Sequence, residues 1–267
     1  MRCQTSILIV IFLFSNFLFA QTECLEFFHE NGNLSSQEFY NENWDRVGTW
    51  TYYFDNNQLL KKEVFKDDYI TGEVIEYYKN GTINKKTKYS KKGTKRIEVN
   101  YNKDGFIRSL TRFVGYAKNG EAVNYYSDSG KIMSKVNYKQ GKKDGKYTTY
   151  NRDGNIKEIK NYKKDRLDGK QVSYFENGQV KLKTVYKSNH YSGKHTTYYE
   201  NGIVKSSIQY DDDGKLITVI VMNDVDGNSL DKGTLKNGNG TYYEYDDKGN
   251  IKRTYEMKGG RRTYHRN

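Results

Sequence analysis

The chain of 267 residues contains no proline, two cysteines and two tryptophans. The absence of proline excludes a collagen, and two cysteines are too few for a disulfide scaffold. Long apolar runs are also missing after the first twenty residues, so no later segment is expected to span a membrane. The signatures of the common enzyme classes are absent as well, as shown below. These absences direct attention to what the chain is rich in, which is tyrosine, lysine and glycine.

The N-terminus has the pattern of a secretory signal peptide. Arg2 supplies a positive charge, an apolar run follows from Ile7 to Phe19, and Ala20 offers a small residue for cleavage. The run is too short for a transmembrane helix, which needs about 18 apolar residues or more. We therefore expect a mature protein without a transmembrane segment that is exported to the periplasm, to the outer membrane or out of the cell.

Removal of this segment would take Cys3 with it and leave Cys24 as the one cysteine of the mature chain. One cysteine cannot form an internal disulfide bond. Two alternatives remain for Cys24, a site of lipid attachment and an inert or buried thiol. The residues before it, Gln21 to Glu23, do not resemble a lipoprotein signal, so the inert thiol is favoured.

Composition alone points toward disorder. Leucine, isoleucine, valine and phenylalanine are scarce in the mature part, and the net charge is +12. Many of the 26 tyrosines, however, recur with a regular period, and this pattern favours a folded chain despite the low apolar content.

The period is about 24 residues, and we mark it by ten anchor positions: Gly32, Asn57, Gly81, Gly105, Gly130, Gly154, Gly178, Gly202, Gly227 and Gly249. Four residues before the anchors stand Phe28, Tyr53, Tyr77, Tyr101, Tyr126, Tyr150, Tyr174, Tyr198, Asn223 and Tyr245. Two residues after them stand Leu34, Leu59, Ile83, Ile107, Ile132, Ile156, Val180, Val204, Ser229 and Ile251. Eight residues after them stand Tyr40, Phe65, Tyr89, Phe113, Tyr138, Tyr162, Tyr186, Tyr210, Leu235 and Met257. Three such columns identify a repeat array.

Each anchor predicts a β-hairpin, because Asn-Gly and Asp-Gly between β-rich runs mark tight turns. A three-residue loop with a left-handed glycine would pair position −4 with position +2. Since side chains alternate along a strand, we expect positions −4, +2 and +8 to share one face. Looser polar turns are expected between hairpins, at Gly141–Gly145, Lys164–Gly169 and Ser192-Gly193.

The predicted fold is all-β: an elongated antiparallel meander, or solenoid, of about ten tandem hairpins in one continuous twisted sheet. We expect three segments, a signal peptide at 1–20, regular hairpin repeats at 21–214, and irregular repeats at 215–267 that continue the array. The ninth repeat departs from the pattern, because Leu216 to Met222 is unusually apolar. It predicts a more deeply buried strand or the join to a C-terminal subdomain.

The stretch from Asn177-Gly178 through Tyr186 and Gly193 to Tyr198-Tyr199-Glu200-Asn201-Gly202 resembles the bacterial variant of the MORN repeat, and the resemblance covers roughly residues 26 to 267. It is most similar to the YwqK-type proteins, which are named as antitoxins. The resemblance implies a MORN-like hairpin array that acts as a protein- or lipid-binding scaffold, with a toxin as one kind of partner. Two features differ from the family: tryptophan stands before the paired aromatics only at Trp50, and a signal peptide is unusual for a cytosolic antitoxin.

No residue pattern points to catalysis. The histidines are His29, His190, His195 and His265, and only two of them are close in sequence, so solvated loop residues are expected and no metal site. The runs Asp211–Gly214 and Asp224–Gly227 lack calcium-loop spacing and predict Asp-Gly turns. There is no nucleophile elbow and no phosphate-binding loop. We therefore expect no catalytic residues, no cofactor and no enzyme.

The candidate binding surface is a basic, aromatic face opposite the three columns. Its predicted members are Phe54, Tyr78, Phe175, Tyr199, Lys86, Lys88, Lys157, Lys181, Lys183 and Lys205. Two interpretations remain open: a solvated face kept soluble by lysine, and a surface for an acidic protein partner or an anionic lipid or polysaccharide of the envelope. Nucleic acid is not an expected partner of an exported protein.

Overall fold

The computed structural model describes residues 22–90, 93–246 and 248–263, and every regular element in these ranges is a β-strand. The predicted signal peptide, Cys3 and His265 lie outside the described residues. Within the described part, no helix is long and apolar enough to cross a membrane. The chain divides into two compact units, unit 1 at Met1–Lys131 and unit 2 at Ile132–Asn267.

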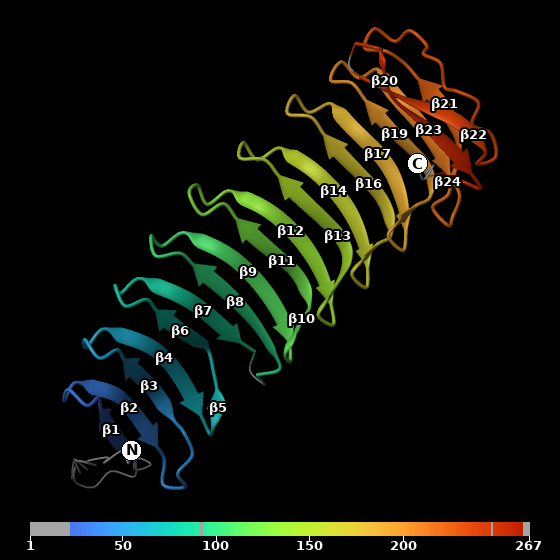
Figure 1. The fold of residues 1–267 in the computed structure, drawn as a ribbon. Coiled ribbons are helices and arrows are strands. Elements are labelled where there is room, and N and C mark those ends of the chain that lie inside the picture. The colour runs from blue at the N-terminus through green and yellow to red at the C-terminus, as the bar shows by residue number, and fades with distance from the viewer. Residues whose placement is uncertain (1–21, 91–92, 247, 264–267) are drawn as a thin grey trace. The chain divides into compact units, whose positions relative to one another are not determined.

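The strands of each unit follow one another in chain order (Figure 1). Unit 1 contains β1 (Glu23–Phe28), β2 (Leu34–Tyr40), β3 (Gly48–Tyr53), β4 (Leu59–Lys66), β5 (Tyr69–Ile70), β6 (Glu73–Tyr77), β7 (Ile83–Tyr89), β8 (Lys95–Tyr101), β9 (Ile107–Val114), β10 (Ala117–Lys118) and β11 (Gly120–Tyr125). Unit 2 contains β12 (Ile132–Lys139), β13 (Lys142–Tyr150), β14 (Ile156–Lys163), β15 (Arg166–Leu167), β16 (Gly169–Tyr174), β17 (Val180–Lys187), β18 (His190–Tyr191), β19 (Gly193–Tyr198), β20 (Val204–Tyr210), β21 (Leu216–Met222), β22 (Gly240–Tyr245), β23 (Ile251–Lys258) and β24 (Arg261–Arg262).

Consecutive long strands pair antiparallel within each unit, and the last three strands form a separate small sheet. The predicted all-β class and its tandem antiparallel hairpins are therefore confirmed. The two-residue strands β5, β10, β15 and β18 pair with the same partner as the strand that follows them.

The anchor loops adopt the predicted three-residue form. In the loop at Gly178, the N–H of Phe175 donates to the carbonyl of Gln179 at 2.8 Å, and Gly178 is left-handed with φ of 84°. Position −4 then pairs with position +2, as Tyr174 does with Val180. The loop at Gly130 differs. The Tyr126 N–H donates to the Lys131 carbonyl, so this loop contains four residues, which accounts for the 25 residues between the anchors Gly105 and Gly130.

The expectation that all three columns share one face is wrong. A bulge follows each three-residue loop; in β17 the register shifts so that Ser173 pairs with Leu182, and Lys181 is the extra residue. Gly169 pairs with Tyr186 and lies five residues before Tyr174 on the same strand. Because side chains alternate along a strand, Tyr174 and Tyr186 point to opposite faces.

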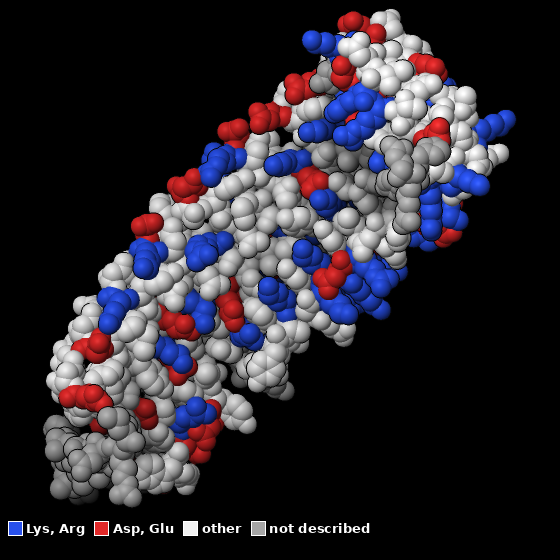
Figure 2. All heavy atoms as spheres, viewed as in Figure 1, with Lys and Arg blue, Asp and Glu red and all other residues white. Residues whose placement is uncertain are grey.

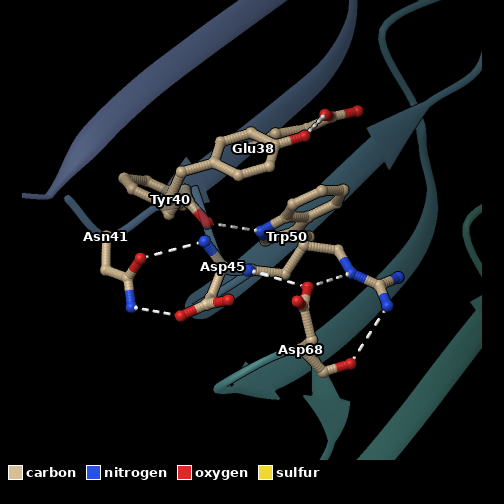
Figure 3. A network of polar contacts seen from close by, with 8 residues as sticks. Glu38, Tyr40, Asn41, Asp45, Trp50 and Asp68 are labelled. Carbon is tan, nitrogen blue, oxygen red and sulfur yellow. Dashed lines mark hydrogen bonds and ion pairs between the residues drawn. The ribbon is translucent and has the colours of Figure 1, made fainter. Parts of the chain in front are cut away.

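We call the face that carries position +8 the inner face and the face that carries position −4 the outer face. The inner face of unit 1 shows the packing plainly: the Trp50 ring lies 5.0 Å from Phe65 and 5.0 Å from Tyr40. The indole of Trp50 also donates to the Phe39 carbonyl at 2.9 Å (Figure 3). Tyr53 is three residues beyond Trp50 on the same strand and therefore lies on the outer face.

The connections between hairpins are tighter than expected. Lys164 and Asp165 form a two-residue turn with φ of 50° and 68°, the type I′ pattern that matches strand twist. Left-handed residues other than glycine cost about 1–2 kcal/mol each. Hydrogen bonds to the preceding repeat offset that cost: Asp165 N–H donates to the Lys143 carbonyl, and its carboxylate accepts from the Lys143 N–H at 2.8 Å.

The same contact between repeats recurs in unit 1. The carboxylate of Asp68 accepts from the backbone N–H of Arg46 at 3.1 Å and from its guanidinium at 3.0 Å (Figure 3). The preceding turn is ordered by Asn41, whose amide oxygen accepts from the Asp45 N–H at 2.9 Å. In these repeats the connecting turn bonds to the turn before it, and contacts of this kind stabilise hairpins that are marginal alone.

The small sheet of β22–β24, here called the C-terminal sheet, does not extend the edge of β21. Instead the edge carbonyl of Ile217 accepts from Gly238, and the Leu216 N–H donates to the Gly260 carbonyl. A buried cluster joins the two layers and consists of Leu216, Val219, Met222, Leu235, Tyr242 and Met257. The apolar run that departs from the repeat pattern therefore forms a buried strand, and the edge of the array in unit 2 is covered.

The turn asparagines link neighbouring repeats. Asn177 Nδ2 donates to the Glu200 carbonyl at 3.1 Å, while its Oδ1 accepts from the Gln179 N–H at 2.9 Å. We predict that Asn177→Asp keeps the turn acceptor, loses the donor to the next repeat, and lowers the free energy of unfolding by about 1 kcal/mol. Urea denaturation measures this loss. Asn155→Asp is the control, because it makes the same change in an exposed turn; equal losses in both variants would contradict the role of the link.

Candidate binding surfaces

The bulges divide the predicted basic face between the two sides of the sheet. Lys181 and Lys205, at position +3, lie beside the aromatic residues at position −3, with ammonium groups 5.4 Å from the Phe175 ring and 5.0 Å from the Tyr199 ring. Lys183, two residues further along β17, lies instead over Tyr198 at 5.6 Å, on the outer face. The ten predicted residues therefore do not form one surface.

The remaining predicted residues follow the same division. Lys157 is the extra residue of the bulge in β14 and is exposed. Phe54 has the Lys79 ammonium 6.0 Å from its ring, and Tyr78 donates its hydroxyl to the Tyr101 carbonyl at 2.8 Å. In these two repeats the aromatic residue at position −3 serves as a contact to the next repeat.

The outer face of unit 1 combines lysines with exposed aliphatic side chains. Lys86 pairs across the strands with Ile75, and Lys88 pairs with Ile97, which is 37 % exposed. Val64 on β4 is exposed to the same extent. Side chains of this kind on an uncovered sheet face can be buried against a partner, with the lysines supplying charge at its margin.

A cleft of about 1000 Å³ lies in unit 2 between the inner face of its hairpins and the C-terminal sheet. One side is formed by Leu182, Ser206 and Ile208, and the other by Tyr242 and Tyr243. The lining is predominantly apolar and aromatic, with a few charged groups, which is the usual character of ligand sites.

His195 lies at the edge of this cleft and is not the solvated loop residue that the sequence predicted. Its ring is 4.7 Å from Tyr191 and 6.2 Å from Tyr210, and Nδ1 is 3.2 Å from the Thr184 hydroxyl. Burial lowers the pKa of His195 below its ordinary value of 6.5. Burial likewise raises the pKa of Tyr210 to about 12 and raises that of Tyr186.

The described residues contain no group of three or more metal-binding side chains. Asp211 forms the expected turn, with its carboxylate accepting from the N–H groups of Asp213 and Lys215. Cys24 is a free, half-buried thiol in β1, and its pKa is raised, chiefly by burial. A raised pKa reduces the thiolate fraction and hence the reactivity of the sulfur.

The sequence missed the residues that the C-terminal sheet contributes to the cleft. Tyr242, Tyr243, Tyr255 and Arg262 are not among the site residues predicted from the sequence. Their repeat positions are visible in the sequence, but the packing of their sheet on the inner face is a tertiary event.

A comparison with known protein families identifies the same repeat in this chain. The model of the MORN repeat variant matches residues 24–42, 46–67, 70–91, 118–140, 143–164, 167–188 and 191–212, more than half of the chain. No curated protein matches in sequence.

Two solved structures, described as TcdB2-TccC3-TEV and as the Photorhabdus luminescens Tc holotoxin pore with the mutation TccC3-D651A, share 10 % and 9 % identity, each with a TM-score of 0.22. They cover 90 % and 88 % of this chain, which spans only 14 % and 15 % of theirs. A likeness this distant carries no functional argument.

The half-buried His195 predicts a pH dependence of stability. Between its lowered pKa in the folded chain and 6.5, the unfolded chain binds the proton more readily, so stability falls as pH decreases through this window. We expect the melting temperature to fall between pH 7 and pH 5, and to fall less in His195→Gln. The same replacement at the exposed His190 is the control. An equal pH dependence in wild type and His195→Gln would contradict the assignment.

Proposed function

The chain belongs to the MORN repeat variant family, and on that premise we propose that it is an exported, non-enzymatic scaffold that binds a protein partner through the outer face of its hairpins. The outer face of unit 1 carries this proposal. There Lys86, Lys88 and Ile97 stand on neighbouring strands, and the side chain of Ile97 is 37 % exposed.

Exposed aliphatic side chains favour a protein as partner. Burying Val64 and Ile97 against another surface removes apolar area from water, at roughly 25 cal/mol per Å². The lysines beside them favour an acidic partner and speed its association. In its most specific form the proposal is an antitoxin- or immunity-like role with a toxin as partner, supported by the resemblance to the YwqK-type proteins. The predicted signal peptide supports export.

An anionic lipid or polysaccharide of the envelope is the alternative partner. Its support is the net charge of +12. On the face drawn in Figure 2, however, acidic side chains are interspersed with the basic ones in both units. Mixed charge suits a specific protein surface better than a uniformly anionic membrane, for which a continuous basic patch is expected.

Charge reversal on the outer face tests the proposal. We expect the immobilised chain to capture one partner from an envelope extract, and Lys86→Glu with Lys88→Glu to reduce that capture about tenfold, since two interfacial charges are reversed. The control reverses the exposed Lys103 and Lys157, which lie in a turn and in a bulge.

Equal losses in both double variants, or no captured protein, would count against the scaffold. Salt-sensitive sedimentation with anionic liposomes or cell-wall polysaccharide, lost only in the outer-face variant, would instead establish the envelope alternative.

A further inference from the structure

The cleft of unit 2 is distinct from the outer face and has a chemistry of its own. Its floor comes from the inner face of β16 to β20, and its opposite wall comes from β22 to β24. The two layers are held together by the buried cluster that includes Met222 and Tyr242, which also line the cleft. The cleft is therefore built by packing between two sheets, and turn residues such as Glu200 and Asn201 complete its lining.

Its walls suit an apolar body. Leu182, Ile208 and Met222 present aliphatic surface on one side, and Tyr242 and Tyr255, whose rings stack at 4.8 Å, present aromatic surface on the other. Such walls exclude water and gain contact with a flat or aliphatic ligand. At about 1000 Å³ the space accommodates a molecule of drug-like size.

The charged groups of the cleft favour an anion. Lys181 and Lys205 line it from the bulges of β17 and β20, which are two strands apart, so their backbones are separated by about 10 Å. Arg262 adds a third cation from the C-terminal sheet, with its guanidinium 4.0 Å from the Tyr255 ring.

The three cations outnumber the acidic side chains of the cleft. Two line the cleft, Glu200 and Glu244. The carboxylate of Glu244 already accepts from the Tyr255 hydroxyl at 2.7 Å, and that hydrogen bond lowers its pKa. A cationic ligand is disfavoured for a second reason, since the rings of Phe175 and Tyr199 already hold the ammonium groups of the two lysines.

We propose that this cleft binds a small amphipathic anion, an aliphatic or aromatic body that carries one carboxylate or sulfonate. The body lies between the aliphatic floor and the tyrosines of the C-terminal sheet. The acidic group lies between Lys181 and Lys205, where it forms charge-assisted hydrogen bonds.

Two related dyes test the charge requirement on the purified full chain. The anionic probe is 8-anilinonaphthalene-1-sulfonate, and the neutral probe is N-phenyl-1-naphthylamine, which lacks the sulfonate. We expect one equivalent of the anionic dye to bind, about tenfold more tightly than the neutral dye, because only the sulfonate forms charge-assisted hydrogen bonds with the lysines. Fluorescence titration measures both affinities and the stoichiometry.

Matched variants locate the anionic group. Lys181→Gln with Lys205→Gln is expected to weaken binding of the anionic dye about tenfold and to leave the neutral dye unchanged. Lys157→Gln with Lys170→Gln is the control, because it removes the same charge from two exposed lysines that do not line the cleft. The altered lysines are not part of the buried cluster, so the melting temperature of each variant should match wild type.

Competition distinguishes the two sources of the ligand body. Displacement of the bound dye by decanoate identifies an aliphatic acid, and displacement by 1-naphthoate identifies an aromatic one. The proposal is overturned if neither acid competes, if the neutral dye binds as tightly as the anionic one, if several equivalents bind, or if the control variant loses affinity equally. None of these outcomes depends on capture of a protein by the outer face.

Discussion

Each three-residue hairpin loop is followed by one extra residue, and the backbone pairing around that residue determines which side chains meet. The loop pairs Tyr174 with Val180, but the bulge at Lys181 restores pairing only at Leu182. The aromatic residue before the turn and the aromatic residue at position +8 are thereby placed on opposite faces. Every surface in both units, the outer face with its lysines and the inner face with its cleft, depends on this local insertion.

A thin repeat sheet also needs contacts between repeats, because it has little apolar core. Several of the most buried side chains are polar, among them Thr87, Ser134 and Thr184 at 3 to 4 % exposure. The array compensates with hydrogen bonds between turns: Asp165 and Asn189 each bond to the repeat before them, and Asn177 bonds to the one after. The energetic unit is therefore the hairpin with its neighbours.

The C-terminal sheet covers the open edge of β21 and, in the same position, forms one wall of the cleft. Its approach to β21 occupies edge groups such as the Ile217 carbonyl, and its tyrosines face the inner surface of the preceding hairpins. The residues that line the cleft could not be predicted from the sequence, for a physical reason. Lys181 and Lys183 differ by two positions and should share a face, yet the bulge separates them; Tyr242 and Ile208 are far apart in sequence and meet only through sheet packing.

The strand content, the period, the three-residue turns and the pairing of −4 with +2 could all be predicted from the sequence, because they follow from glycine conformation and from local alternation of side chains. The turn at Asp211–Gly214 was also predicted correctly from its sequence. The folded chain was needed to establish the face on which each column lies, the type I′ form of connections such as Lys164-Asp165, and the partial burial of His195. Those features depend on bulges, on hydrogen bonds to a neighbouring repeat and on the packing of two sheets, none of which has a signal within a single 24-residue period.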